Sequence, residues 1–293
     1  AASDVYKRQR LSKQNPTQTD PMKRKLEEGF RLCYNLEALS RLQNNLDVAL
    51  KIDFDQAANK ALKYLPKGTN IDSKVYLTID NFNPGMVYKG NVGRSILSGL
   101  DNVNMDILAH EFHHIGFNNC LSKRTAVIQK AHTPLDTGDV VIHFIYHLAM
   151  EGLANHYCSP LSVKQGSHKS VEANEKIASY EDCLCNSLED TWKLIEDCMD
   201  ETVLFSEAVD RVNDFIIDNE SILPKVHFIG EKIISVIEEN YENSFMDIIE
   251  ICNHPENQVL LYSKSANKLG LPTLSVELLE KIMNLFSHAD MFG

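Results

Sequence analysis

The feature that most constrains this chain is a pair of histidines that a helix would place one turn apart. Residues 110–114 read His-Glu-Phe-His-His, which fits the pattern H-E-x-x-H. In a helix, His110 and His114 point from one face toward the same position, and Glu111 lies where it can reach a metal-bound water. A tetrahedral metal site needs a third protein ligand, which must come from another part of the chain. The fold must therefore bring a second element onto this helix.

The best candidate for the third ligand is Glu151, in the middle of a predominantly apolar stretch of helical pattern. An unpaired carboxylate would be costly to bury there, and a metal would remove that cost. Gly152 permits close approach of another helix, and Asn155 lies one turn away, where it could hydrogen-bond a ligand histidine. His143 and His147 share the face of Glu151 and are alternative third ligands, although we favour a role for both as polar residues lining a cleft.

Other residues that could suggest a metal are better explained by structure. His113 faces away from the proposed metal, because neighbouring residues in a helix point about 100° apart. In Cys183-Leu184-Cys185 the two thiols diverge on a helix, and no C-x-x-C partner exists. We interpret these as helix cysteines that bind no metal.

Composition excludes several classes of function. The chain has 293 residues, 43% hydrophobic and 24% charged, as expected for a soluble globular protein. Its formal net charge of −12 argues against nucleic-acid binding and against anionic membrane surfaces. No apolar run approaches the roughly 18 to 20 residues that span a bilayer, so we predict no membrane span in this chain.

Localisation and the N-terminus are read from weaker signals. Seven cysteines at irregular spacing do not suggest a disulfide framework, which favours a reducing, cytoplasmic compartment. The opening residues AASDVYKRQ resemble a translated sequencing-adapter fragment, and position 1 is not Met. We therefore expect residues 1–22 to be a disordered tail that is partly artefactual, with the native N-terminus missing and a signal peptide left open.

The order of predicted elements places the motif after a small sheet. The block 23–65 has helical periodicity and ends at Pro66-Lys67-Gly68. The predicted strands are 74–80, 87–88 and 95–97, the last two in a glycine-containing stretch with Gly90, Gly93 and Gly99. The predicted helices that follow are 101–116, with Gly116 as its stop, then 139–157, 177–195, 203–217, 228–249 and 276–286.

These elements predict one α+β domain over residues 23–293 that is mostly helical. Residues 23–165 would hold a small antiparallel sheet and the metal-binding helices, and residues 166–293 would form a helical half. The cleft would lie between the two. An edge of the sheet beside the cleft, in the glycine-containing stretch, would let a substrate backbone pair as an added strand.

His110-Glu111-x-x-His114 followed by Glu151-Gly152-Leu153-Ala154 resembles the gluzincin metallopeptidases. More closely, the chain resembles a group of bacterial zinc-dependent peptidases over roughly residues 70 to 262. Those proteins have a strand pair, a His-Glu-x-x-His helix, a Glu-Gly-x-Ala helix and a later helix of Tyr-x-x-Gly type. Here His227-Phe228-Ile229-Gly230 stands in place of that last pattern, so the expected aromatic hydroxyl is absent.

The resemblance implies a zincin-like domain with Zn²⁺ held by His110, His114 and Glu151 and with Glu111 as general base. Zinc lowers the pKa of bound water to about 7, and a carboxylate within reach can take its proton. The oxyanion would need a further protein donor. Candidates, without a ranking, are His227, His156, Tyr157 and Tyr180.

The sequence therefore predicts zinc-dependent hydrolysis of peptide bonds in a peptide or protein substrate. Two alternatives stay open: a non-catalytic module that keeps the fold, and a zinc hydrolase that acts on a non-peptide bond. Retention of Glu111 argues against the first, because a purely structural metal site has no use for a general base. No G-x-S-x-G string supports a serine mechanism.

Overall fold

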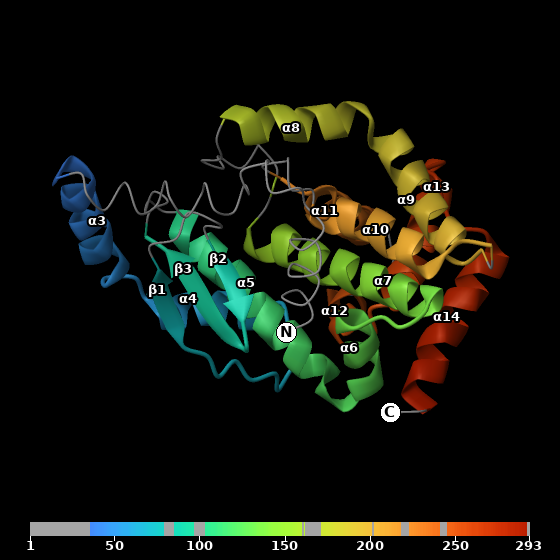
Figure 1. Ribbon diagram of the computed structural model, residues 1–293, viewed down its shortest axis with the longest axis horizontal. Coiled ribbons are helices and arrows are strands. Elements are labelled where there is room, and N and C mark those ends of the chain that lie inside the picture. The colour runs from blue at the N-terminus through green and yellow to red at the C-terminus, as the bar shows by residue number, and fades with distance from the viewer. Residues whose placement is uncertain are drawn as a thin grey trace, which may run out of the picture.

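The computed structural model describes residues 36–78, 85–96, 103–159, 161, 171–200, 202–217, 223–240 and 245–291. Over these residues the chain is mostly helical and holds one small sheet, so the predicted α+β class is confirmed (Figure 1). The predicted tail at 1–22 lies outside the described residues. The zincin-like arrangement and the domain bounds stay predictions.

The helices carry the labels of Figure 1 and have the following bounds: α3 Leu36–Ala49, α4 Phe54–Leu62, α5 Val103–Cys120, α6 Thr125–His132, α7 Thr137–Leu153, α8 Val171–Asp182, α9 Leu184–Cys198, α10 Phe205–Ile217, α11 Lys225–Asn240, α12 Phe245–Ile249, α13 Asn257–Leu269 and α14 Val276–Met291. A π-helical turn, Ala154–Cys158, continues α7. The predicted helix 139–157 therefore corresponds to α7 and this turn together.

Gly116 does not end the helix that carries the histidine motif. α5 continues past it to Cys120. A Cβ at residue 116 would lie 2.2 Å from Cδ1 of Leu65, so the glycine makes room for a side chain that follows α4. The prediction of a stop at Gly116 was wrong because its missing side chain serves packing rather than a left-handed turn.

Several predicted helices are divided in the structure. The block 23–65 is interrupted between α3 and α4, where Asp53 accepts a hydrogen bond of 2.9 Å from the backbone of Gln56 and caps α4. The predicted helix 177–195 is divided into α8 and α9 at Cys183. The predicted helix 228–249 covers α11 from Phe228 onward and α12, with residues 241–244 outside the described part. Apolar periodicity alone does not show such breaks, because it continues through a short interruption.

The sheet is mixed rather than antiparallel. Its strands are β1 Val75–Thr78, β2 Gly85–Tyr88 and β3 Asn91–Ser95, in the order β1-β3-β2. β2 and β3 form an antiparallel hairpin with Tyr88 opposite Asn91, whereas β1 runs parallel to β3. Lys89 and Gly90 both have positive φ, 50° and 73°, which is the two-residue turn that matches the twist of a hairpin. The prediction of a wholly antiparallel sheet was wrong because β1 joins the far side of β3.

Two apolar cores meet at α5. The smaller core packs the sheet and α4 against α5 through Val92, Ala57 and Leu108. The larger core fills the helical part of the molecule and includes most of α7 and α11, together with Phe117 from the end of α5. As a result, residues 108–117 are all buried. α5 is therefore buried on every side over these residues.

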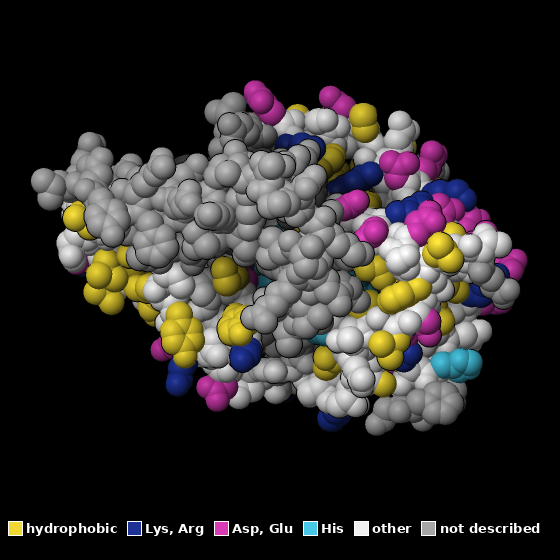
Figure 2. All heavy atoms as spheres, in the orientation of Figure 1, with side chains coloured by type: hydrophobic (Ala, Val, Ile, Leu, Met, Phe, Trp, Pro, Cys, Tyr) yellow, Lys and Arg dark blue, Asp and Glu magenta, His cyan; other side chains and the backbone are white. Residues whose placement is uncertain are grey.

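The sheet end of the molecule also carries exposed apolar side chains. Figure 2 shows hydrophobic side chains gathered over α3 and the sheet, at the left of the view. Leu50, Tyr76 and Tyr88 are among the exposed ones.

None of the helices that the structure describes is both long enough and apolar enough for a membrane crossing.

Candidate metal centre

Three side chains from two helices converge between the two cores. His110 and His114 of α5 and Glu151 of α7 each offer a ligand atom, and these atoms lie within 4.8 Å of one another. Nε2 of His110 is 3.2 Å from Oε2 of Glu151, and Nε2 of His114 is 3.5 Å from Oε1. The side chains are 9 to 13% exposed. The structure therefore brings together the residues that the sequence singled out as ligands.

The protonation states of His114 and Glu151 fit a divalent cation. Burial lowers the pKa of His114 to about 3, so its imidazole is neutral. Burial alone would raise the pKa of Glu151, but the neighbouring histidines, His227 first, hold it well below its usual value. Zinc requires neutral imidazoles and an ionised carboxylate. Among the residues that the structure describes, Nδ1 of His114 has no hydrogen-bond partner, so none of them offers a carbonyl or carboxylate that orients this ring.

Glu111 lies beside the cluster and against the sheet. A Cβ at Gly85 of β2 would lie 2.8 Å from Oε1 of Glu111, so the carboxylate occupies space that only glycine leaves open. Burial raises its pKa to about 8, the negative charge of Glu151 adds to this, and the positive charge of Arg94 opposes it. The raised pKa means that two negative charges are costly here, a cost that a metal cation would lower.

His227 reaches the same cluster from α11. Its Nδ1 lies 3.0 Å from Oε2 of Glu151 and 3.0 Å from Nδ2 of Asn155. Asn155 also donates a hydrogen bond of 2.8 Å to the carbonyl of Glu151. The structure thus places Asn155 against His227, whereas the sequence suggested a bond to a ligand histidine. The π-helical turn that contains Asn155 explains why its direction did not follow from regular helical spacing.

Two glycines bring His227 onto Glu151. A Cβ at Gly152 would lie 2.6 Å from the carbonyl oxygen of Gly230, and a Cβ at Gly230 would lie 2.6 Å from that of Leu148. The backbones of α7 and α11 are therefore in direct contact, and the two helices lie side by side in Figure 1. The close approach predicted for Gly152 is confirmed.

The other candidates for an oxyanion donor have partners elsewhere. Nε2 of His156 lies 2.7 Å from Oε2 of Glu238, and the hydroxyl of Tyr157 donates to Oε1 of the same carboxylate at 3.1 Å. The hydroxyl of Tyr180 donates to the carbonyl of Leu223 at 3.4 Å. Of the four candidates, His227 is the one that contacts the metal cluster.

The remaining histidines of the two motifs turn away from the cluster. Nε2 of His113 lies 3.1 Å from the carbonyl oxygen of Tyr64, on the side of the smaller core, as the helical angle predicted. Nδ1 of His143 contacts the carbonyl oxygen of Ala131. The ring of His147 packs edge-on against His143, with centroids 4.5 Å apart. Neither His143 nor His147 belongs to the convergent group among the described residues.

Sequence reasoning missed Arg94, Asn118 and Tyr146 near the site. The guanidinium of Arg94 is fully buried, and its charge acts on Glu111. Asn118 and Tyr146 hydrogen-bond each other at 2.6 Å between α5 and α7. The available signals were an arginine directly before a strand candidate and a tyrosine within the apolar helix that carries Glu151. Neither residue stands at a motif position, so only the fold shows what it touches.

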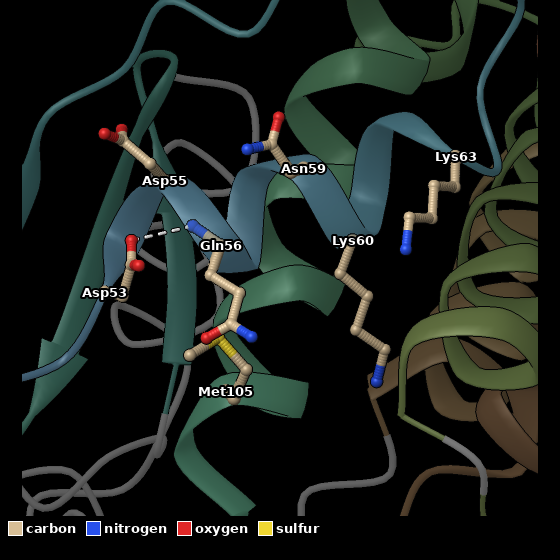
Figure 3. Close-up of a pocket in the computed structure, with 7 residues that line it drawn as sticks. All are labelled: Asp53, Asp55, Gln56, Asn59, Lys60, Lys63 and Met105. Atoms are coloured by element: carbon tan, nitrogen blue, oxygen red, sulfur yellow. Dashed lines mark hydrogen bonds between the residues drawn. The ribbon is translucent and has the colours of Figure 1, made fainter.

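A separate pocket lies on α4. It is lined by Asp53, Asp55, Gln56, Asn59, Lys60, Lys63 and Met105, which Figure 3 draws. Lys60 is held by hydrogen bonds of 2.6 Å to Asp106 and 2.8 Å to the carbonyl of Cys158. None of the residues of the metal cluster lines this pocket, so it is not the candidate centre.

Comparison with known families gives a match over residues 2–270, to a family model described as "Putative zinc dependent peptidase (DUF5700)". The chain belongs to this family. Zinc is the cofactor that the family description names, and His110, His114 and Glu151 form a group that could hold it. Comparisons with curated proteins and with solved structures found no match.

Proposed function

We propose that this protein is a zinc-dependent peptidase of gluzincin type, which hydrolyses peptide bonds by direct attack of water. The observation that carries the proposal is the division of roles between the acidic residues. Glu151 belongs to the convergent group with His110 and His114, whereas Glu111 is buried beside that group and does not belong to it. A structural metal site has no need of such a second carboxylate.

Zinc, when bound, supplies a positive charge that polarises the scissile carbonyl and lowers the pKa of water to about 7. Glu111 takes the proton of the attacking water and then delivers it to the leaving amine. Burial raises the pKa of Glu111 to about 8 in the metal-free chain, and the positive charge of bound zinc would lower it toward the working pH, where an acid–base catalyst is most effective.

His227 would stabilise the developing negative charge on the carbonyl oxygen by donating a hydrogen bond. Its side chain is 25% exposed, more than the 9 to 13% of the three predicted ligands, so it faces the more open side of the cluster. Asn155 would orient the ring through its contact with Nδ1. In this role His227 replaces the aromatic hydroxyl of similar peptidases.

β2 would hold the substrate. It is an edge strand of the described sheet, and its first residue, Gly85, packs on Glu111. A peptide that paired with β2 would run past the general base, and main-chain hydrogen bonds would bind it without regard to most of its side chains. We therefore propose that the substrate strand adds to β2 and not at Gly90, Gly93 or Gly99.

The test combines metal analysis with peptide-library cleavage on the wild type and three variants. We expect about one zinc per chain in the wild type, in Glu111→Gln and in His227→Ala, and loss of zinc in Glu151→Ala. Cleavage should be chelator-sensitive in the wild type, abolished in Glu111→Gln and lowered about 10²- to 10³-fold in kcat in His227→Ala. His147→Ala is the matched control for Glu151, since it lies on the same face of α7 and should keep its zinc.

Three outcomes would contradict the proposal. Zinc binding without cleavage across a broad library would favour a non-catalytic binding module. Cleavage that survives in Glu111→Gln at the wild-type rate would show that another group acts as the base. Hydrolysis of ester or amide substrates other than peptides, with the library uncut, would favour a zinc hydrolase of a different bond.

A further inference from the structure

We propose that Tyr146 and Asn118 form a clamp between α5 and α7 that positions the metal ligands and thereby sets the affinity for zinc. The inference rests on the metal site of the proposed function, but it does not depend on the reaction. Both are positioning residues, because neither belongs to the convergent group of potential ligands.

The clamp is a short chain of hydrogen bonds. The hydroxyl of Tyr146 donates to Oδ1 of Asn118 at 2.6 Å. Nδ2 of Asn118 donates to the carbonyl oxygen of His114 at 2.8 Å. The chain therefore runs from α7 to the backbone of a predicted ligand on α5, and Asn118 uses both ends of its amide.

The position of the clamp relates it to the ligands. Asn118 lies one turn beyond His114, on the histidine face of α5, and Tyr146 lies between one and two turns before Glu151. Asn118 follows His114 in α5, whereas its partner Tyr146 precedes Glu151 in α7. The two helices therefore run antiparallel past the site. The clamp holds them together one turn away from the point where their ligand atoms meet.

The tyrosine is suited to this role by its surroundings. Its side chain is 1% exposed, and its ring packs edge-on against Phe117 of α5, with centroids 5.5 Å apart. His132 of α6 packs on the ring at 5.3 Å. Burial raises the pKa of Tyr146 well above its usual value, so the hydroxyl keeps its hydrogen. The ring contacts fix the side chain even without the hydroxyl, which allows the hydrogen bond to be removed alone.

The affinity for zinc should respond to loss of the clamp, because the predicted ligands lie on separate helices. Tetrahedral coordination tolerates only a few tenths of an ångström in ligand distance. Nε2 of His114 and Oε1 of Glu151 are now 3.5 Å apart, a separation set by how α5 lies on α7. Loss of the clamp lets the helices shift, and the zinc-free protein must then spend binding energy to bring the ligands together. Partners outside the ligand shell typically contribute 10- to 100-fold to metal affinity.

The matched control is a second buried tyrosine. The hydroxyl of Tyr262 in α13 donates to the carbonyl oxygen of Pro272 at 3.0 Å, and the side chain is fully buried. Tyr262→Phe removes one core hydrogen bond, just as Tyr146→Phe does, but joins no helix that carries a predicted ligand. A merely structural role for the Tyr146 hydroxyl would make the two variants equivalent.

The experiment measures the zinc dissociation constant of the full chain by competition with a chromophoric chelator, alongside thermal unfolding of each zinc-free variant. We expect Tyr146→Phe to weaken zinc binding about tenfold, and Asn118→Leu to do so similarly. The double variant should lose little more than either single change, because the two residues act as one unit. Tyr262→Phe should keep the wild-type affinity at a comparable loss of stability.

Wild-type zinc affinity in both Tyr146→Phe and Asn118→Leu would overturn the clamp. So would an equal loss in Tyr262→Phe. If Tyr146→Phe does not fold, the half-buried Asn118 still decides the question through Asn118→Leu. Zinc binding that responds as expected in a protein that cleaves no peptide would refute the peptidase and leave the clamp standing, whereas a wild type that binds no zinc would refute both.

Discussion

The position of Glu111 depends on Gly85, which has no side chain. Oε1 and Cγ of Glu111 and Cγ2 of Ile107 all lie within 3 Å of the place where a Cβ of Gly85 would stand. Because Glu111 is buried and packed between α5 and β2, it cannot move aside without disturbing the sheet. Glu111, the proposed general base, is thus fixed from the strand side as well as from its own helix.

We therefore expect Gly85→Ala to displace Glu111 and to lower kcat at least tenfold, because a misplacement of the order of 1 Å in a catalytic group costs up to 10²-fold. Zinc content should be unchanged, since Glu111 is not among the predicted ligands. Steady-state kinetics with metal analysis on the same preparation checks both expectations.

Gly93→Ala is the control in the neighbouring strand. A Cβ there would lie 3.0 Å from Cγ of Met86, the flexible side chain of its pairing partner, and would not contact Glu111. An equal loss of kcat in both variants would assign the effect to the sheet as a whole and not to Glu111.

The sequence could predict single residues where chemistry demands a particular side chain. Glu151 was predictable because a carboxylate in an apolar helix needs a compensating charge, and His113 because the helical angle turns it away from His114. Asn155 was predicted near the site, but its partner was not, since a π-helical turn changes the direction of its side chain. Arg94 was not predictable, because its environment depends on which strand lies beside β3.

At the scale of elements, the contact of α7 with α11 determines where His227 lies. Gly152 follows Glu151 directly, and Gly230 lies one turn after His227. The carbonyl oxygen of Gly230 is 2.6 Å from a Cβ built on Gly152, so the helices touch through main-chain atoms that cannot rotate away. Any side chain at this crossing must separate them.

Gly152→Ala should destabilise the protein by about 1–2 kcal/mol net. Overpacking a buried contact costs up to about 3 kcal/mol, and the better helix propensity of alanine offsets about 1 kcal/mol of it. Urea unfolding followed by circular dichroism measures the difference, provided that the m-value is unchanged.

Gly138→Ala tests the same exchange at the start of α7. The nearest atom to its Cβ is Cδ2 of Leu285, at 3.0 Å, the end of a flexible side chain. Stability close to that of the wild type is expected. If Gly152→Ala were equally harmless, the two helices would not be held by backbone contact at this point.

Element types were predicted better than their connections. Apolar residues at helical spacing located α5, α7 and α10, while α6 and α13 were missed. The parallel pairing of β1 with β3 could not be read from the strands, since their residue patterns do not record which neighbour they take. The pattern of His227 and Gly230, which the family resemblance singled out, was the one sequence signal that pointed to a contact of α11 with the site.

At the scale of the molecule, the predicted metal ligands lie between the two apolar cores. α5 belongs to both of them, and α7 belongs to the larger one. A ligand that binds the folded chain and not the unfolded chain stabilises it in proportion to the logarithm of its concentration. Zinc held by α5 and α7 should therefore stabilise the whole protein rather than a single loop.

At a zinc concentration 1,000 times the dissociation constant, this stabilisation amounts to about 4 kcal/mol. For a chain of this size we expect a chelator to lower the Tm by about 10 °C. Differential scanning calorimetry with and without the chelator measures the shift. Glu151→Ala should unfold at the same temperature in both conditions, and a chelator response that persists in this variant would place the metal elsewhere.

The burial of α5 on all sides also has a consequence for how the chain folds. His114 and Glu151 are far apart in sequence, and the helix between them, α6, packs on α7 and α14 rather than bridging the ligands. The two faces of α5 are covered by different parts of the fold, one by α4 and the sheet and the other by α7 and the π-helical turn that continues it. During refolding, zinc binding should appear only when the slower of the two cores has formed. The rate at which zinc binding appears would therefore measure completion of the fold.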